Sequence, residues 1–159
     1  MRLHIVASAH KLPDWVTEGV ADYARRFPRD WSLTVLELKA EPRDRGKTVA
    51  QILAAEALRI ESGIATASKN ARRVVLDERG TSWSTKTLAE KLSGWRDEAR
   101  DVVFVVGSAD GLDPALKTRA DDLWSLSAAT LPHGLARLIL VEQLYRAISI
   151  INHHPYHRE

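Results

Sequence analysis

The sequence predicts an α/β protein in which a mostly parallel β-sheet lies between layers of helices. Strand-like and helix-like segments alternate along the chain, as in folds with a parallel sheet. The run from Val102 to Val106 is apolar at every position, which is typical of a strand covered on both faces. No repeat or low-complexity segment interrupts the pattern. A chain of 159 residues suits one domain, which we expect to span residues 1–159.

Local signals place the elements in the first half of the chain. The second expected strand shows the alternation of a half-buried strand, and the first expected helix has its proline in the first turn, where the missing N–H is tolerated. Thr48 is a suitable N-cap for the second helix. The expected elements are a strand at 3–7, a helix at 13–26, a strand at 31–38, a helix from Thr48 to about residue 60, and a small, polar connection at 63–70.

The second half continues the alternation. A third strand is expected at 74–76, ending in the turn formed by residues 77–80, and Ser84 or Thr85 caps a helix that reaches about residue 98. The remaining expected elements are a strand at 102–106, a short helix that starts at Pro114, a short strand at 123–126 and a final helix at 133–152.

The composition is that of an ordinary soluble globular protein. Hydrophobic residues make up 45% and charged residues 28% of the chain, which is close to the usual proportions. Cysteine is absent, so disulfides and thiolate metal sites are excluded. No signal pattern and no apolar run of membrane-spanning length occurs, so we expect a cytoplasmic protein without a membrane partner.

Charge indicates little about the partner. The net charge of +2 is compatible with a polyanion but does not require one. On charge alone, we interpret the basic clusters of the chain as solvated surface. These clusters are Arg25, Arg26 and Arg29, and then Arg43, Arg45 and Lys47.

Three loops follow predicted strands and can meet in one ligand pocket. They span residues 76–80, 107–112 and 127–132, and ligands of open α/β sheets bind beyond the carboxyl ends of the strands. Gly107 and Gly111 allow the main chain to approach a ligand or to adopt positive φ, although a purely structural turn explains their spacing equally well. The absence of a GxGxxG motif and of a P-loop argues against a dinucleotide or P-loop nucleotide site.

The third loop and the helix after it carry candidate binding groups. Ser127 and Thr130, with the main chain around them, can hydrogen-bond an adenine edge or an amino-acid group. Glu142 falls near a helix face that carries apolar residues such as Leu138 and Tyr145, where an unpaired charge would be costly. Arg146, one turn on, can pair with it. The pair is either a structural salt bridge or a device that directs arginines toward a polar substrate, and the sequence favours neither.

The chain ends in a dense polar and aromatic segment that contains His153, His154, Tyr156, His157 and Arg158. Chain ends are usually bland, so this one is expected to work at a site. No zinc-ligand spacing fits the histidines, whose only acidic neighbour is Glu159, and we expect no metal. The last aromatic and basic side chains suit stacking on bases and contacts to phosphate or ribose.

In combination, these residues resemble the ribosomal large-subunit pseudouridine methyltransferase H family, a minimal branch of the SPOUT methyltransferases. The resemblance covers almost the whole chain, and its last three segments are the most specific. The segments are Lys11 to Trp15 with Tyr23, Arg25 and Arg26, then Leu76-Asp77 with Gly80, Gly107 to Leu112, Trp124 to Ser127, Thr130 to His133, Glu142, Leu144 to Ala147, and His154 to Arg158.

The resemblance implies a fold, a cofactor and an assembly. Family members are homodimers whose C-terminal part threads a loop to form a trefoil knot, and each active site is completed near the subunit interface. Where the family usually has Gly-Gly, this chain has Gly107-Ser108, which causes strain only if position 108 needs positive φ. The family's S-adenosylmethionine pocket corresponds here to Leu76, Gly107, Ser108, Ser127, Ala128, Ala129, Thr130, Leu131 and Pro132.

The implied reaction is methyl transfer to N3 of a pseudouridine in 23S rRNA, within an assembled ribosome. A sulfonium methyl is already electrophilic, so the enzyme must mainly align the reacting atoms and assist the loss of the N3 proton. An arginine can stabilise the developing oxygen charge. The base is not assigned among the candidate catalytic residues, which are His133, Glu142, Arg146, Tyr156, His157 and Arg158.

Two other functions stay open at this point. One is a non-catalytic ribosome-binding module, which Ser108 weakly favours and which would not bind S-adenosylmethionine. The other is a SPOUT enzyme acting on tRNA, which is expected to carry an RNA-binding extension that this chain lacks.

Overall fold

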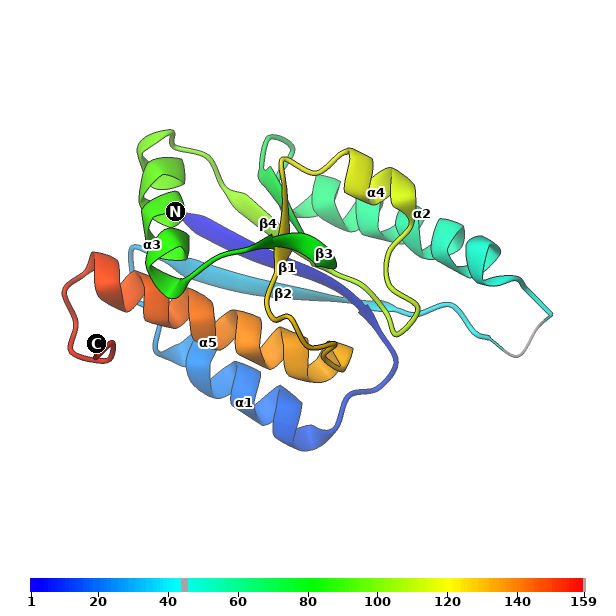
Figure 1. Cartoon of the computed structure of the whole chain (residues 1–159), viewed down its shortest axis with the longest axis horizontal. Coiled ribbons are helices and arrows are strands. Elements are labelled where there is room, and N and C mark those ends of the chain that lie inside the picture. The colour runs from blue at the N-terminus through cyan, green and yellow to red at the C-terminus, as the bar shows by residue number, and fades with distance from the viewer. Residues whose placement is uncertain (44–45, 159) are drawn as a thin grey trace.

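The computed structural model describes residues 1–43 and 46–158. Strands and helices alternate along the described chain (Figure 1). The elements are β1 (Arg2–Ala9), α1 (Asp14–Arg25), β2 (Ser32–Lys39), α2 (Val49–Ala67), β3 (Arg72–Ser82), α3 (Thr85–Asp97), β4 (Val102–Val106), α4 (Pro114–Thr118), β5 (Asp122–Ser125) and α5 (His133–Ile151).

The five strands form one sheet in the order β2-β1-β4-β3-β5, and each neighbouring pair is parallel. Parallel strands share their carboxyl ends at one edge of a sheet, so the loops that follow β3, β4 and β5 emerge side by side. All five residues of β4 are buried, as expected for the central apolar run. The prediction of a parallel α/β sheet is confirmed.

Alternate residues of the central strands enter two separate cores. Ile5 of β1 and Phe104 of β4 pack in the core beneath α1, α3 and α5. Val6 and Val105, the next residues along, pack beneath α2 and α4 on the opposite face. Figure 1 shows α1 and α5 lying side by side on one face of the sheet and α2 on the other. Helical layers therefore cover both faces, as the sequence predicts.

The second helix is longer than expected. It begins after Thr48, whose side chain and that of Gln51 form a reciprocal capping box, but it continues to Ala67 instead of ending near residue 60. The interpretation of residues 63–70 as a connection is wrong for their first half. A Cβ at Gly63 would lie 3.1 Å from the Leu36 side chain. The glycine thus permits close packing of α2 on the sheet, and this packing outweighs its low helix propensity.

The third strand is also longer than expected, because it resumes after the segment that was expected to end it. β3 pairs with β5 up to Leu76 and again from Thr81, with a register shift between these two residues. The segment 77–80 bulges out of the ladder at the edge where the loops emerge. Bulges of this kind are common beside active sites, where they redirect side chains.

The basic clusters are partly paired on the surface. Arg25 and Arg26 both contact Asp22, and Arg43 lies 2.8 Å from Asp110. Arg45 lies outside the described residues. None of the helices in the described ranges combines the length and apolarity needed to cross a membrane.

Candidate active site

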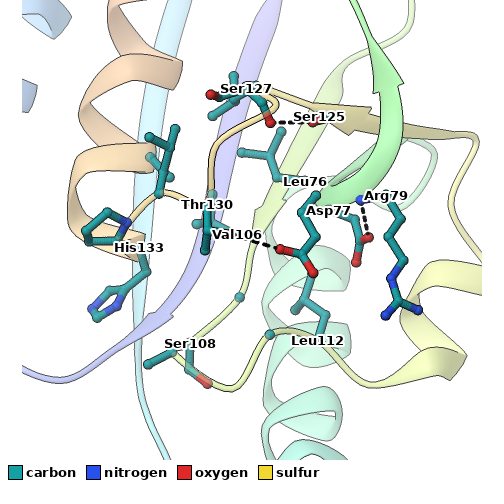
Figure 2. A pocket seen from close by; sticks show the side chains of 18 of the residues that line it. Leu76, Asp77, Arg79, Val106, Ser108, Leu112, Ser125, Ser127, Thr130 and His133 are labelled. Carbon is teal, nitrogen blue, oxygen red and sulfur yellow. Dashed lines mark hydrogen bonds between the residues drawn. The ribbon is translucent and has the colours of Figure 1, made fainter.

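The loops after β3, β4 and β5, with the start of α5, surround a cavity of about 730 Å³, which lies within the usual range for small-molecule sites. Figure 2 shows Asp77 and Arg79 on one side of it and Thr130 and His133 on the other. Eight of the nine predicted cofactor residues line the cavity, all except Ala128. Cofactor binding by these residues stays a prediction, but the three loops do meet in one place.

The β4 loop turns back tightly at its glycines. A Cβ at Gly107 would lie 2.5 Å from the carbonyl oxygen of Gly111. Gly111 has φ of +88°, and its N–H donates to the Ser108 carbonyl over 3.0 Å. The only described non-glycine residues with positive φ are Ala99 and His153. Ser108 therefore adopts an ordinary conformation, and the serine introduces no backbone strain.

The bulge of β3 brings charged side chains to the cavity that the sequence analysis did not select. Asp77, Glu78 and Arg79 line it, together with Lys117 from α4. Asp77 forms an ion pair with Lys117 and accepts a 2.9 Å hydrogen bond from the Arg79 N–H. Burial raises the pKa of Asp77, but these bonds outweigh burial and hold the pKa below its ordinary value. The sequence signal for Asp77, Glu78 and Arg79 was their place after a predicted strand, and Lys117 on α4 had no such signal.

The β5–α5 loop is held by its own side chains. The Ser125 hydroxyl donates to the Ser127 carbonyl, and the Ala129 N–H donates to the Ser127 hydroxyl, both over 2.9 Å. The Thr130 hydroxyl donates to the Glu78 carboxylate over 3.3 Å, and both residues line the cavity. Within the described chain, no backbone–backbone hydrogen bond uses the main chain of Ala128, Thr130 or Leu131. These groups remain available to a ligand.

His133 is the one predicted catalytic residue that lines the cavity. It is the first residue of α5, and its pKa is lowered by burial and then by the charges of Arg137, His10 and Arg43. At neutral pH the imidazole is therefore uncharged and can accept a proton. Three segments of the chain, at His10, at Arg43 and at the start of α5, contribute to this environment.

The other predicted catalytic residues lie toward the far end of α5. A helix rises about 1.5 Å per residue, so Arg146 is roughly 20 Å along the axis from His133. In Figure 1 the C-terminus lies at the end of α5 opposite to its start. Glu142, Arg146, Tyr156, His157 and Arg158 do not line the cavity of their own chain.

At that far end, the predicted i,i+4 pair is present. Glu142 Oε1 accepts hydrogen bonds from Arg146 Nε at 2.8 Å and Nη2 at 2.5 Å. The Tyr156 hydroxyl donates to the same oxygen over 3.1 Å, and Gln143 donates to the other oxygen over 2.7 Å. Glu142 is half-buried, because the fully buried face of α5 runs instead through residues such as Leu140 and Leu144. His157 is half-buried and Arg158 is exposed.

The described residues contain no group of three or more side chains arranged to hold a metal ion.

Comparison with known proteins identifies the family. The family model described as "Predicted SPOUT methyltransferase" matches residues 1–157. This chain belongs to the SPOUT methyltransferase family. A protein of Nitrosospira multiformis named "Ribosomal RNA large subunit methyltransferase H" is 51% identical over 158 residues, and a protein of the same name from Paraburkholderia xenovorans is 49% identical. Each match covers 99% of both chains.

Solved structures share the fold at low sequence identity. A probable methylase family protein from Haemophilus influenzae Rd KW20 has a TM-score of 0.58 at 13% identity, over 99% of this chain and 70% of that chain. A probable methyltransferase from Bordetella pertussis Tohama I has a TM-score of 0.57 at 16% identity, over 92% and 95% of the two chains. At these identities the likeness shows the fold alone.

Proposed function

We propose that this SPOUT methyltransferase transfers the methyl group of S-adenosylmethionine to N3 of a pseudouridine in 23S rRNA, within an assembled cytoplasmic ribosome. The names of relatives at about 50% identity support rRNA of the large subunit as the substrate. The observation that carries the proposal is the cavity at the carboxyl ends of β3, β4 and β5, lined by eight of the nine residues expected to hold the cofactor.

The cavity suits the parts of S-adenosylmethionine. Leu76, Val106, Leu112 and Leu131 offer apolar surface to an adenine ring. The unpaired main-chain groups of the β5–α5 loop can hydrogen-bond the ring edge. Charged side chains of both signs line the β3 side, where a zwitterionic amino-acid group can lie. When bound, the cofactor would supply a methyl carbon already activated for transfer.

In the proposed reaction the N3–H bond of pseudouridine and the methyl C–S bond break, and an N3–C bond forms. The neutral imidazole of His133 can accept the N3 proton at the edge of the cavity. A guanidinium from Arg146 or Arg158 can stabilise the negative charge that develops on the neighbouring carbonyl oxygen. The products are the methylated nucleotide, S-adenosylhomocysteine and a proton.

A homodimer would bring the two groups of residues together. Because Arg146 and the residues after it lie roughly 20 Å along α5 from the cavity, we propose that the end of one chain completes the cavity of its partner. SPOUT family membership supports this dimer and the trefoil knot of the C-terminal part.

Transfer of labelled methyl tests the function. Ribosomes from cells that lack this protein, free rRNA and free tRNA are each incubated with the protein and labelled S-adenosylmethionine. We expect label only in 23S rRNA of the ribosomes. Label in free tRNA would favour a tRNA enzyme. No label anywhere, with no calorimetric binding of S-adenosylmethionine, would favour the binding module.

Mixed dimers test the shared site. A chain with Gly107→Ala has a blocked cavity but an intact C-terminal end. A chain truncated after Pro155 has an intact cavity but lacks the C-terminal end. If the end acts on the partner's cavity, mixing the two inactive variants restores part of the activity. If it acts within its own chain, the mixture stays inactive.

A further inference from the structure

The C-terminal tail, residues 152–158, is docked on α1 and α5 through one tyrosine. The hydroxyl oxygens of Tyr23 and Tyr156 are 3.2 Å apart, although 133 positions separate them in the chain. We propose that Tyr23 is a positioning residue for methyl transfer, because it fixes the place from which the tail acts. This inference rests on the proposed function, in which the tail contributes to catalysis.

The turn that starts the tail is well defined. His153 has φ of +52°, and the His154 N–H donates to the Ser149 carbonyl over 2.8 Å. The chain thus reverses after α5 and runs back beside it.

Tyr156 is the residue that anchors the reversed segment. Its ring packs edge-on against Tyr145 with 4.7 Å between ring centroids, and the Arg146 guanidinium lies 4.7 Å from the ring centroid of Tyr156. These two contacts hold the ring, while the hydroxyl is shared between Glu142 and Tyr23.

The donor of each hydrogen bond among Tyr23, Tyr156 and Glu142 can be assigned. The Glu142 carboxylate only accepts, so the single hydroxyl proton of Tyr156 is donated to it. Tyr23 must then donate to the Tyr156 oxygen. Burial raises the pKa of Tyr156, and the nearby Glu142 charge adds to the effect, so the phenol keeps its proton at neutral pH. The Tyr23–Tyr156–Glu142 sequence of bonds therefore persists under working conditions.

Loss of the Tyr23 hydroxyl removes one of the two partners of the anchor. Tyr156 is followed directly by His157 and exposed Arg158, whose positions depend on it. One hydrogen bond between partly buried neutral groups, as here, changes a docking equilibrium by up to about tenfold. The cavity lies at the other end of α5, so cofactor binding is unaffected.

The experiment compares Tyr23→Phe with Tyr145→Phe. Both remove one hydroxyl from the same aromatic cluster, but the Tyr23 hydroxyl bonds Tyr156, whereas Tyr145 contacts Tyr156 through its ring. For Tyr23→Phe we expect kcat to fall roughly tenfold, with unchanged calorimetric affinity for S-adenosylmethionine and faster amide hydrogen exchange at residue 154 and residues 156–158. Tyr145→Phe should match the wild type in all three measurements.

Two results would overturn the inference. Tyr23→Phe with wild-type kcat and wild-type exchange in the tail would remove the positioning role. A parallel loss of kcat and cofactor affinity would show general structural damage instead. Failure of the proposed function can be recognised separately. In that case the wild-type protein itself would transfer no methyl to ribosomes, regardless of the rate of amide hydrogen exchange measured in the tail.

Discussion

Arg137 on α5 is 1% exposed, yet its ion-pair partner Glu37 on β2 has a side chain that is 62% exposed. The guanidinium Nε has no partner among the described residues. Burial lowers the pKa of Arg137, against the opposing effect of Glu37. The pair joins the first turns of α5 to the carboxyl-terminal half of β2. The buried guanidinium thus depends on a carboxylate at the surface.

This asymmetry predicts that removing the exposed partner is the more harmful change. Glu37→Ala leaves a buried cation without its acceptor and should lower the free energy of unfolding by about 1–3 kcal/mol. Arg137→Met removes the charge together with its desolvation cost and should destabilise less. Urea denaturation of both variants measures the two losses. The opposite order would mean that packing of the guanidinium, rather than its charge, stabilises α5.

Gly107→Ala should abolish binding of S-adenosylmethionine. The new methyl would lie 2.5 Å from the Gly111 carbonyl oxygen, so the β4 loop must move out of its place in the cavity wall. Gly94→Ala is the matched control, because nothing lies within 4 Å of a Cβ at that site in α3, and it should stabilise the helix by about 0.5–1 kcal/mol. Titration calorimetry and thermal unfolding report the two effects. Wild-type affinity in Gly107→Ala would place the cofactor elsewhere.

Arg146→Ala should lower turnover much more than stability. The pair with Glu142 is partly exposed, with side-chain exposures of 30% and 17%, and such i,i+4 pairs contribute less than about 1 kcal/mol. A guanidinium that stabilises developing charge contributes about 10²-fold in kcat. Arg100→Ala, which removes a surface arginine 3.9 Å from Asp121, serves as the control. A large drop in melting temperature with unchanged turnover per folded molecule would make the pair purely structural.

The rate of methyl transfer should rise with pH to a plateau, and the midpoint of the rise should lie below pH 6.5. The pKa of His133 is lowered from its ordinary 6.5 by burial and neighbouring charges, so the base form prevails above the lowered value. His133→Gln should lose this acidic limb and most of the rate. Single-turnover rates at a series of pH values measure it, and an unchanged limb would assign the base to another residue.

The free energy of unfolding should also rise with pH, as the rate of methyl transfer does. Below pH 6.5 the unfolded chain binds more protons than the folded chain at His4 and His133, whose pKa values are both lowered first by burial. The stabilisation is therefore complete above pH 6.5 and is lost as the pH falls. His133→Gln should reduce the slope of the unfolding free energy against pH without removing it, because His4 remains.

Truncation after Pro155 should abolish methylation and leave cofactor binding nearly intact. The deletion removes Tyr156 and the residues after it, which do not line the cavity of their own chain. Methylation assays and calorimetry on the same preparation separate the two functions. Undiminished methylation would show that the tail has no role in the reaction.

Periodicity was sufficient to predict most of the fold, because the central strand β4 is apolar throughout and helix caps are local signals. The expected strand at 102–106 and helix at 133–152 agree with β4 and α5 to within one residue. The errors at Gly63 and after Leu76 have a common cause. In both places the local sequence looks like a break, and packing against the sheet or pairing with β5 continues the element.

The candidate site divides in the same way. The cavity could be predicted, since loops after parallel strands must share one edge. The presence of the Asp77 and Lys117 side chains in the cavity wall could not be predicted, because their orientation depends on the β3 bulge and on the position of α4. The separation of Arg146 and the tail from the cavity follows from the length of α5, and the proposed joining of the two depends on a second chain; a residue pattern describes neither.

The two strands at the centre of the sheet come from distant parts of the chain. The Arg2 N–H bonds Asp101 across 99 positions, and β1 has only β2 as a partner until β4 has been synthesised. A nascent chain therefore carries an open strand edge during most of its translation, which favours aggregation and calls for protection by chaperones. Long-range parallel pairing also makes folding slow. The cavity can therefore form only after the β5–α5 loop, late in the sequence, has left the ribosome that makes the protein.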